Sequence, residues 1–364
     1  MAKKIKVGII GVGNCFAGLI QGVEYYKKNK SRKIIGLMHQ KIGNYNFDDI
    51  EFSSAFDVGK NKIGDSLERA VYASPNMVNW VKLPKIKTIV REAPILDGIG
   101  IYVVNKIKPI KNPKPIEKLA KEIEKEIKKT GTEILVNYLP VGSQKATEFW
   151  ANIALKTKCA FINCIPAFIA SEKKWAKKFE KEKIPIIGDD IKSQVGATIV
   201  HRVLTKLCID RGAKIEKTYQ INVGGNTDFL NMKEQKRLES KKISKTEAVT
   251  SQLGEKIDAD NIYIGPSDFI PFLGNKKLAF IRLEGKMFAD IPFSIELRLD
   301  VDDKANSGGI VIDTVRLAKL GLDRKIGGPL ISSSAYLMKH PPFQFSDEKA
   351  REMVEEFIIG TSRR

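Results

Sequence analysis

Two glycines near the amino end, Gly11 and Gly13, have the type and spacing of a phosphate-binding turn. They follow an apolar run, Ile5–Ile10, and precede Cys15–Lys27, whose apolar residues recur at helical spacing. Where a strand turns sharply into a helix, the backbone can approach a pyrophosphate closely, and the helix N-terminus offers it N–H groups. Phe16 stands where the usual fingerprint has a third glycine. A Gly-x-Gly pair alone is weak support, so a tight turn without a ligand is the alternative.

A carboxylate, Asp57, ends the next apolar run, Ser53–Asp57. In that place it is expected to accept the hydroxyl groups of an adenosine ribose and to repel a 2′-phosphate. The pattern therefore favours NAD over NADP as the cofactor. The separation from the glycines is longer than the roughly 20 residues of the usual fingerprint, because residues 34–50 intervene.

Short apolar runs that alternate with helical segments predict an α/β domain with a Rossmann-like, doubly wound parallel sheet covered on both faces. The expected strands are Ile5–Ile10, Ser53–Asp57, Thr88–Val90, Ile134–Leu139, Ala160–Ile165 and Pro185–Gly188. The expected helices include Cys15–Lys27, Pro115–Lys129 and Gln144–Lys156.

After Asp190 the pattern changes to a long helix and longer alternating strands, which predicts a central α+β domain with a mixed, open sheet. Its expected elements are the helix Gln194–Arg211 and the strands Lys217–Val223, Lys277–Gly285 and Pro292–Val301. Helical periodicity resumes at Asn306–Leu320, Ala335–Leu337 and Asp347–Ile359, and we expect this tail to pack back on the first domain. The predicted division is residues 1–200 with 304–364 for NAD binding, and 201–303 for catalysis and oligomerisation.

The chain of 364 residues carries a formal charge of +19, which favours anionic partners without choosing among them. Its Lys-rich stretches, 106–129 and 173–183, alternate with Glu and apolar residues and so predict solvated helix faces. We find no recognition-helix, RNP or OB signature, and we expect no nucleic-acid partner. The apolar run Val7–Val12 is too short for a signal-peptide core or a membrane span, and four scattered cysteines do not make a disulfide framework. We therefore expect a cytoplasmic enzyme that does not bind membranes.

Several longer segments resemble the myo-inositol-1-phosphate synthases of archaea and actinobacteria over nearly the whole chain. Beside the opening Gly11–Cys15, they are Ala55–Val58, Leu96–Gly100, Tyr138–Ser143, Gly188–Thr198, Gly224–Asn231, Glu239–Lys245, Ile264–Asp268, Ile326–Pro329 and Ser334–Lys339. The resemblance implies conversion of D-glucose 6-phosphate, as substrate, to 1D-myo-inositol 3-phosphate without net redox change. It implies that NAD oxidises C5 of the open-chain sugar, that C6 attacks C1 as an enolate, and that the hydride then returns to the ring ketone.

The resemblance also implies four active-site lysines, because each intermediate of this reaction places negative charge on oxygen. By motif they are Lys241, Lys245, Lys277 and Lys339, although Lys276 leaves the register of the third open by one. Lys241 and Lys245 stand four residues apart, so on a helix both project from one face. We expect Lys241 and Lys339 to transfer protons, and Lys245 and Lys277 to hold phosphate and oxyanions.

Polar side chains complete the site that the resemblance implies. Asn226 and Asp228 are expected to act with the catalytic lysines. The residues expected at the cofactor are Gly11, Gly13, Asn14, Cys15, Asp57, Leu139, Pro140, Asp190 and Asp303. Asp303 is also the one candidate ligand for a divalent cation, but the ammonium of Lys304 beside it would fit poorly with a metal, so metal binding stays open.

The alternative to this activity is an ordinary NAD-dependent dehydrogenase of a phosphorylated or acidic small metabolite, which would share the cofactor domain but produce NADH. The resemblance further implies a homotetramer. From the residues alone, the alternating strands within Lys277–Val301 could supply its interface.

Overall fold

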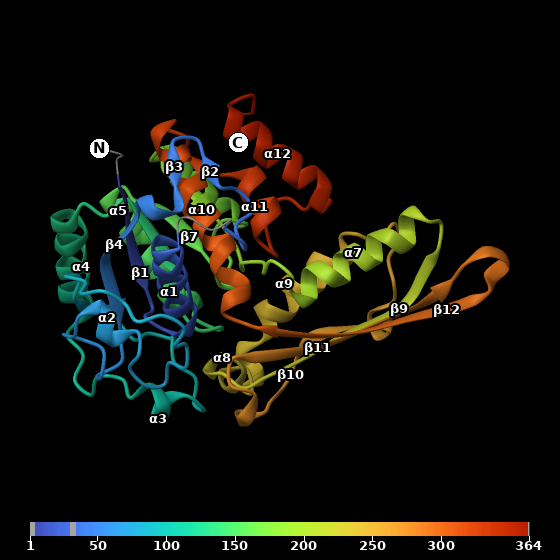
Figure 1. Cartoon of the computed structure of the whole chain (residues 1–364), viewed down its shortest axis with the longest axis horizontal. Helices are drawn as coiled ribbons and strands as arrows, with labels where there is room; N and C mark the ends of the chain where they lie inside the picture. Colours follow the sequence, from blue (N-terminus) through green and yellow to red (C-terminus); the bar gives the residue numbers. More distant parts are fainter. Residues whose placement is uncertain (1–3, 30–33, 363) are drawn as a thin grey trace.

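A computed structural model describes residues 4–29, 34–362 and 364, and two main sheets organise that part of the chain (Figure 1). The first sheet is parallel throughout. In spatial order its strands are β13 (Gly328–Pro329), β8 (Pro185–Ile187), β7 (Ala160–Asn163), β6 (Ile134–Asn137), β1 (Ile5–Ile10), β4 (Ile50–Asp57) and β5 (Val90–Glu92). The predicted Rossmann-like parallel sheet is thus confirmed.

Helices cover both faces of the parallel sheet, and a separate apolar core lies under each layer. One layer contains α1 (Asn14–Lys28), α10 (Ala305–Asp323), α11 (Ile331–Leu337) and α12 (Asp347–Ile359). The other contains α4 (Ile116–Thr130), α5 (Gln144–Thr157) and α6 (Lys173–Lys181). Because α10 follows the second sheet in the chain yet packs on β7 and β8, the prediction that the tail returns to the first domain is confirmed.

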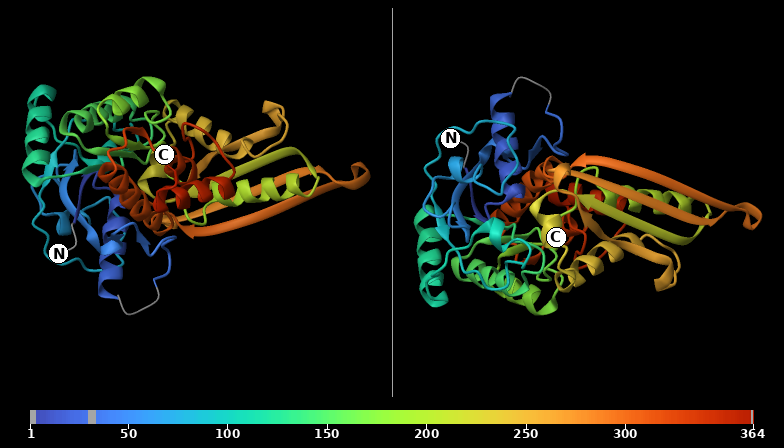
Figure 2. Two further views of the ribbon diagram at one scale, coloured as in Figure 1. Left: turned by 90° about the horizontal axis from the view of Figure 1, so that it is seen from above. Right: turned by 90° about the horizontal axis from the view of Figure 1, so that it is seen from below.

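The second sheet is mixed, as predicted, and extends away from the parallel-sheet domain as a long arm in both views of Figure 2. Its strands, in spatial order, are β10 (Ile262–Phe269), β9 (Lys214–Gly224), β11 (Lys276–Lys286) and β12 (Pro292–Asp302). β10 runs parallel to β9, whereas the other two pairs are antiparallel. On one face α7 (Ala197–Asp210) packs against β9 and β11, and α9 (Glu239–Thr250) packs against β10. The domain boundaries themselves remain a prediction.

The structure departs from the sequence-based elements in a few places. β10 was not expected, since Pro266 interrupts its pattern; it pairs only with β9, and proline is tolerated on such an edge strand. The strand expected at Thr88–Val90 lies slightly later, as β5. Shorter elements complete the described chain: β2 (Lys41–Ile42), β3 (Tyr45–Asn46), α2 (Leu67–Ala70), α3 (Val104–Ile107) and α8 (Thr227–Asn231).

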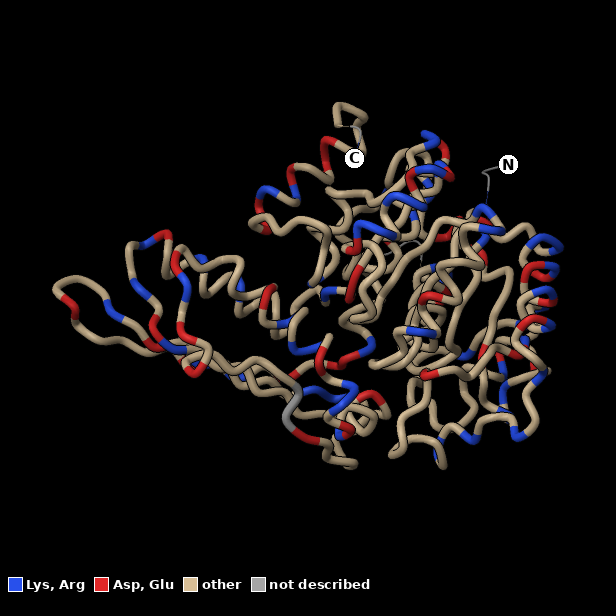
Figure 3. The backbone as a smooth tube through the Cα atoms, turned by 180° about the vertical axis from the view of Figure 1, so that it is seen from behind, with Lys and Arg blue, Asp and Glu red and all other residues tan. Residues whose placement is uncertain are grey.

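The charge is spread along solvated surfaces. On α4, Leu119, Ile123 and Ile127 are buried while most of the remaining side chains face solvent. Figure 3 shows Lys and Arg interleaved with Asp and Glu along this helix. The prediction that this Lys-rich stretch forms a solvated helix face is confirmed. No helix in the described residues is both long enough and apolar enough to span a bilayer.

Candidate active site

The glycine turn lies between β1 and α1, at the carboxyl edge of the parallel sheet. Gly11 has a φ of +90°, and a Cβ there would lie 3.0 Å from the carbonyl oxygen of Tyr138. At Gly13, an added Cβ would meet nothing within 4 Å. Open space therefore lies against the first turn of α1, where unpaired N–H groups attract a phosphate. Asn14 Nδ2, buried at the same turn, has no hydrogen-bond partner within the described residues. These features fit a dinucleotide.

The carboxylate of Asp57 stabilises this turn by accepting hydrogen bonds from backbone N–H groups. One carboxylate oxygen accepts the N–H of Val12 at 2.7 Å, and the other accepts the N–H groups of Val58 and Gly59, each at 2.8 Å. Lys62, which the sequence analysis overlooked, adds an ammonium 3.9 Å from the carboxylate and donates to the Val12 carbonyl. A carboxylate has about four lone-pair positions, so capacity remains for a ribose hydroxyl. The ribose contact stays a prediction.

A second pocket adjoins the first, and all four predicted lysines line it. We call it the lysine pocket; the cavity lined by Gly11, Gly13, Asn14 and Asp57 is the nucleotide pocket. Two of the lysines, Lys241 and Lys245, lie on α9 as their spacing predicted. Lys277, the second residue of β11, lines the pocket, whereas its neighbour Lys276 is exposed and does not line it, which favours Lys277 as the predicted third lysine. Lys339 follows α11.

Asp190 binds three of the donors in the lysine pocket. Its carboxylate lies 2.9 Å from the Lys241 ammonium, 3.1 Å from that of Lys339 and 2.7 Å from the Ser244 hydroxyl. Its side chain is almost fully buried. Burial by itself would raise the pKa of Asp190, but the two ammonium groups hold that pKa below its ordinary value. Asp190, predicted at the cofactor, therefore lies among the lysines.

The preceding residue, Asp189, shows why only one carboxylate of the Asp-Asp pair reaches the pocket. Its oxygens accept the backbone N–H groups of Ile169, Ala170 and Ser171, and the side-chain amide of Asn163. The Asp189 carboxylate therefore stabilises the fold by these hydrogen bonds and does not face the lysine pocket. The sequence gives no sign of the difference, because both aspartates occupy the same motif.

Burial and mutual repulsion lower the pKa values of two lysines. The pKa of Lys339 falls to about 8, chiefly because it is buried, although Asp190 partly restores it. Burial, with the charges of Lys277, Lys241 and Lys339, lowers the pKa of Lys245 further. Among the described residues, no carboxylate lies within ion-pairing distance of Lys245. The pKa of Lys339 thus lies near neutrality, and burial together with neighbouring charges favours the uncharged form of Lys245.

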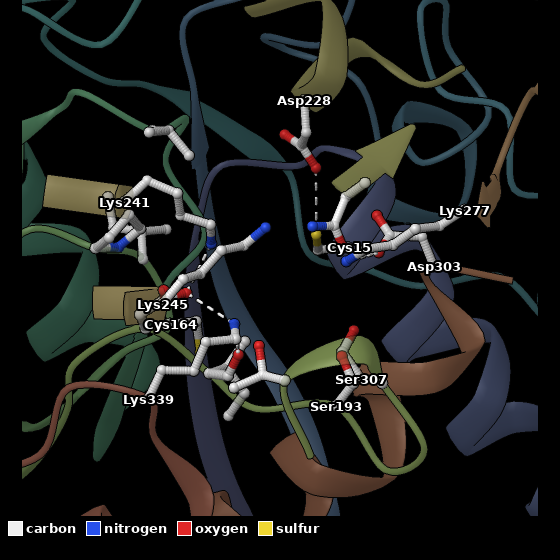
Figure 4. A pocket seen from close by; sticks show the side chains of 18 of the residues that line it. Cys15, Cys164, Ser193, Asp228, Lys241, Lys245, Lys277, Asp303, Ser307 and Lys339 are labelled. Carbon is white, nitrogen blue, oxygen red and sulfur yellow. Dashed lines mark hydrogen bonds and ion pairs between the residues drawn. The ribbon is translucent and has the colours of Figure 1, made fainter. Parts of the chain in front are cut away.

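A second charged group, which contains Asp303 and Lys277, faces Lys241, Lys245 and Lys339 across the pocket (Figure 4). Asp303 accepts from Lys277 at 3.3 Å, from Asn226 at 3.1 Å and from Lys304 at 2.9 Å. Lys304 also lies 2.6 Å from Asp228. Burial opposes ionisation of Asp303, but Lys304 and Lys277 hold its pKa below the ordinary value. Asn226 has a second function, since its side-chain oxygen caps α8.

This second group does not fit the divalent cation for which Asp303 was the candidate ligand. The ammonium of Lys304 lies directly between the carboxylates of Asp228 and Asp303. Within the described residues, no three His, Cys, Asp or Glu side chains are grouped to hold a metal ion. A dication placed here would be repelled by Lys304 and Lys277 and would lack a ligand set.

The two pockets share a wall. Cys15, Tyr138, Leu139 and Asp228 line both of them, whereas Pro140 lines the nucleotide pocket alone. The predicted cofactor residues of the glycine turn and of the segment after β6 are therefore brought together, next to the lysines. Asp303 and Asp190 belong to the lysine pocket instead. A reactant in the lysine pocket would meet a cofactor at this shared wall.

The cysteines and histidines near the site are not its chemical centre. Burial raises the pKa of the Cys15 thiol to about 11 and that of Cys164 well above its ordinary value, so both remain thiols. His201 is buried against Thr218, and burial lowers its pKa to about 4. His340 stacks on Phe168 outside the lysine pocket.

Comparisons with known proteins agree with this geometry. Residues 196–304 match the family described as myo-inositol-1-phosphate synthase. Over 367 residues the chain is 49% identical to the inositol-3-phosphate synthase of Mycolicibacterium smegmatis, with 99% of each chain covered. It is 48% identical over 362 residues to that of Corynebacterium glutamicum, with 98% of each covered. A solved structure of a myo-inositol-1-phosphate synthase-related protein from Thermotoga maritima, 23% identical, has the same fold, with a TM-score of 0.81 over 98% of each chain.

The two glycines of the turn should respond differently to the same substitution. Gly11→Ala places a side chain at positive φ against the Tyr138 carbonyl and should lower the free energy of unfolding by about 1–3 kcal/mol. Gly13→Ala meets no atom of the fold but replaces the N-cap of α1, and should lower that free energy by at most about 1 kcal/mol. It fills the phosphate space, however, and should weaken dinucleotide binding by about tenfold or more. Denaturant unfolding without cofactor and a cofactor titration measure the two effects. Unchanged binding by Gly13→Ala would contradict the placement of the phosphate.

Proposed function

The chain belongs to the inositol-3-phosphate synthase family, and from that premise we propose how its two pockets convert D-glucose 6-phosphate to 1D-myo-inositol 3-phosphate. In this reaction C5 is oxidised to a ketone, which acidifies C6. The C6 enolate then attacks the C1 aldehyde, and the resulting ring ketone is reduced at the original C5. The carbon skeleton is closed without any net gain or loss of electrons.

One observation carries the proposal: four lysines from three separate segments converge on a pocket that shares a wall with the glycine turn. An ordinary hydride transfer needs a cofactor and one acid or base. Successive oxyanions at C5 and C1, together with a phosphate, need several cations in one place. The lysine pocket supplies them, beside the space where the cofactor fits.

The residues of the nucleotide pocket would hold NAD, which when bound would supply a hydride acceptor and donor at C5. Gly11 and Gly13 leave room for its pyrophosphate at the start of α1. Among the described residues no arginine contacts the carboxylate of Asp57, and this carboxylate suits the unmodified ribose of NAD. Cys15 and Leu139 line the shared wall and would exclude water from a reaction between groups held in the two pockets.

Lys339 and Lys241 move protons at the sugar oxygens. With a pKa of about 8, Lys339 can take the proton of the C5 hydroxyl as the hydride leaves and give it back when the ketone is reduced. Lys241 shares the Asp190 carboxylate with Lys339 and serves the C1 oxygen during ring closure. Asp190 keeps both amines oriented, and Ser244 orients Asp190.

Lys245 and Lys277 hold the phosphate and the oxyanions. Burial and neighbouring ammonium groups lower the pKa of Lys245, and a phosphate dianion would reverse that effect. Binding of the phosphate would thus favour the protonated form of Lys245. Lys277 is fixed by Asp303, while the carboxylate of Asp228, half exposed at the shared wall, is placed to accept sugar hydroxyls.

A homotetramer, which we also propose, would use the arm formed by the second sheet. Side chains alternate between exposed and half-buried along β12, which is an edge strand. The apolar Phe288 and Ile291 at its hairpin end are 92% and 53% exposed. Light scattering distinguishes a tetramer from a single chain.

The alternative, an ordinary dehydrogenase, differs in its electron balance. With catalytic amounts of NAD⁺, the purified protein should convert a large excess of glucose 6-phosphate to inositol phosphate, while NADH stays below the enzyme concentration. The reason is that each hydride removed from C5 returns to the same ring. Absorbance of NADH and chromatography of the phosphates measure both quantities. NADH formed in proportion to the sugar consumed would favour the dehydrogenase.

The rate should depend on pH through Lys339. If its neutral amine takes the C5 hydroxyl proton, kcat/KM should rise with pH through about 8. Asp190 raises the pKa of Lys339, so Asp190→Asn should move this rise to lower pH by about one unit or more in the activity that remains. Ser244→Ala removes a hydrogen bond to Asp190 but no charge, and should leave the position of the rise unchanged. If kcat/KM of the Asp190→Asn variant rises at the same pH as that of the parent, the assignment of this rise to Lys339 is wrong.

A further inference from the structure

Lys304 is a fully buried lysine to which none of the proposed reaction steps assigns a function. It stands between β12 and α10, and only 2% of its side chain is exposed. Its ammonium lies 2.6 Å from Asp228, 2.9 Å from Asp303 and 3.5 Å from the sulfur of Cys15. The cation therefore lies at the wall shared by the two pockets.

The backbone fixes Lys304 in this place. Its own N–H donates to the Asp302 carboxylate at 2.9 Å, immediately before α10 begins. Its stem packs against α1 at Gly18, where an added Cβ would lie 3.3 Å from the Lys304 Cβ. The absence of a side chain at Gly18 thus lets α1 and the start of α10 approach each other, and Lys304 follows the shared wall.

The charges around Lys304 balance without a metal ion. The carboxylates of Asp228 and Asp303 face the ammonium groups of Lys304 and Lys277. Asn226 donates a further hydrogen bond to Asp303. A divalent ion would add two positive charges to a group that is already neutral, in a buried place where repulsion is strong.

Lys304 differs from the other buried lysines of the pocket. Burial by itself would lower its pKa, but Asp228 and Asp303 raise it well above the ordinary value. The two carboxylate oxygens 2.6 and 2.9 Å from its ammonium therefore favour the charged form of Lys304. It is suited to act as a fixed positive charge and unsuited to carry protons.

We propose that the Lys304 ammonium is the resident cation of this active site, tethered between Asp228 and Asp303 where a free metal ion would otherwise be held. The inference rests on the proposed function. The tethered charge orients both carboxylates and stabilises negative charge that develops on the sugar oxygens at the shared wall. The enzyme then needs no divalent cation.

The unmodified protein gives the first test. After treatment with a chelator, its turnover of glucose 6-phosphate should change by less than about twofold, because no metal ion takes part. Mn²⁺ is also titrated into the protein in the absence of substrate. The parent should bind no more Mn²⁺ than the Asp303→Asn variant does. Loss of turnover on chelation that Mg²⁺ or Mn²⁺ restores, or Mn²⁺ binding that depends on Asp303, would overturn the proposal.

The second test removes the tethered charge. In buffer free of metal ions and ammonium, Lys304→Ser should reduce turnover by about 100-fold or more, as loss of a preorganised charge does. Ammonium or Mn²⁺ should restore at least about tenfold, and the variant should bind Mn²⁺ where the parent does not. Lys276→Ser, at an exposed position of β11, should match the parent in every condition.

The outcomes separate the inference from the proposed function. A folded Lys304→Ser protein that stays fully active without added cations, or that no cation restores, contradicts the cation role. If this variant does not fold, chelation and Mn²⁺ binding of the parent still decide. Mn²⁺ binding is measured without substrate, so a parent that forms no inositol phosphate would refute the function alone.

Discussion

Repulsion among buried ammonium groups is the constraint on which this active site depends. Five lysines line one pocket, Lys304 among them. Among the described residues, the carboxylates that pair with them directly are Asp190, Asp303 and Asp228. Burying unpaired charges would cost several kcal/mol each, so some amines give up protons instead. The shifted pKa of Lys339 is a consequence of this balance. An anionic substrate completes it, which links recognition of the phosphate to the state of the catalytic amines.

The fold brings the charged groups of this site together from segments that are distant in the sequence. The lysines come from α9, β11 and the segment after α11, while the glycine turn lies at the start of the chain. The return of α10 to the parallel-sheet domain carries Lys304 to the glycine turn and closes the site from the opposite side. Each sheet with its helices therefore provides only part of the two pockets, which lie where the two meet.

Periodicity was enough to predict the parallel sheet, the mixed sheet and the returning tail, because each has a strong apolar pattern. It missed β10, whose proline is acceptable only because the strand lies at an edge. The lysines could be identified by motif, but their convergence and pKa values depend on packing that no local pattern encodes. No local pattern distinguishes Asp189 from Asp190 either, although Asp189 forms hydrogen bonds within the fold and Asp190 binds the lysines of the pocket. Lys304 carried a usable signal, since a lysine beside a candidate metal ligand argues against a metal.

The central claim is that one resident cofactor oxidises and then reduces the same sugar within this site. Conversion of D-[5-²H]glucose 6-phosphate with unlabelled NAD⁺, in ordinary water, tests it most directly. The account predicts that mass spectrometry finds the deuterium retained in the inositol phosphate, because the hydride removed from C5 returns to the same carbon. Replacement of the deuterium by hydrogen from water or from the pool of free cofactor would contradict it.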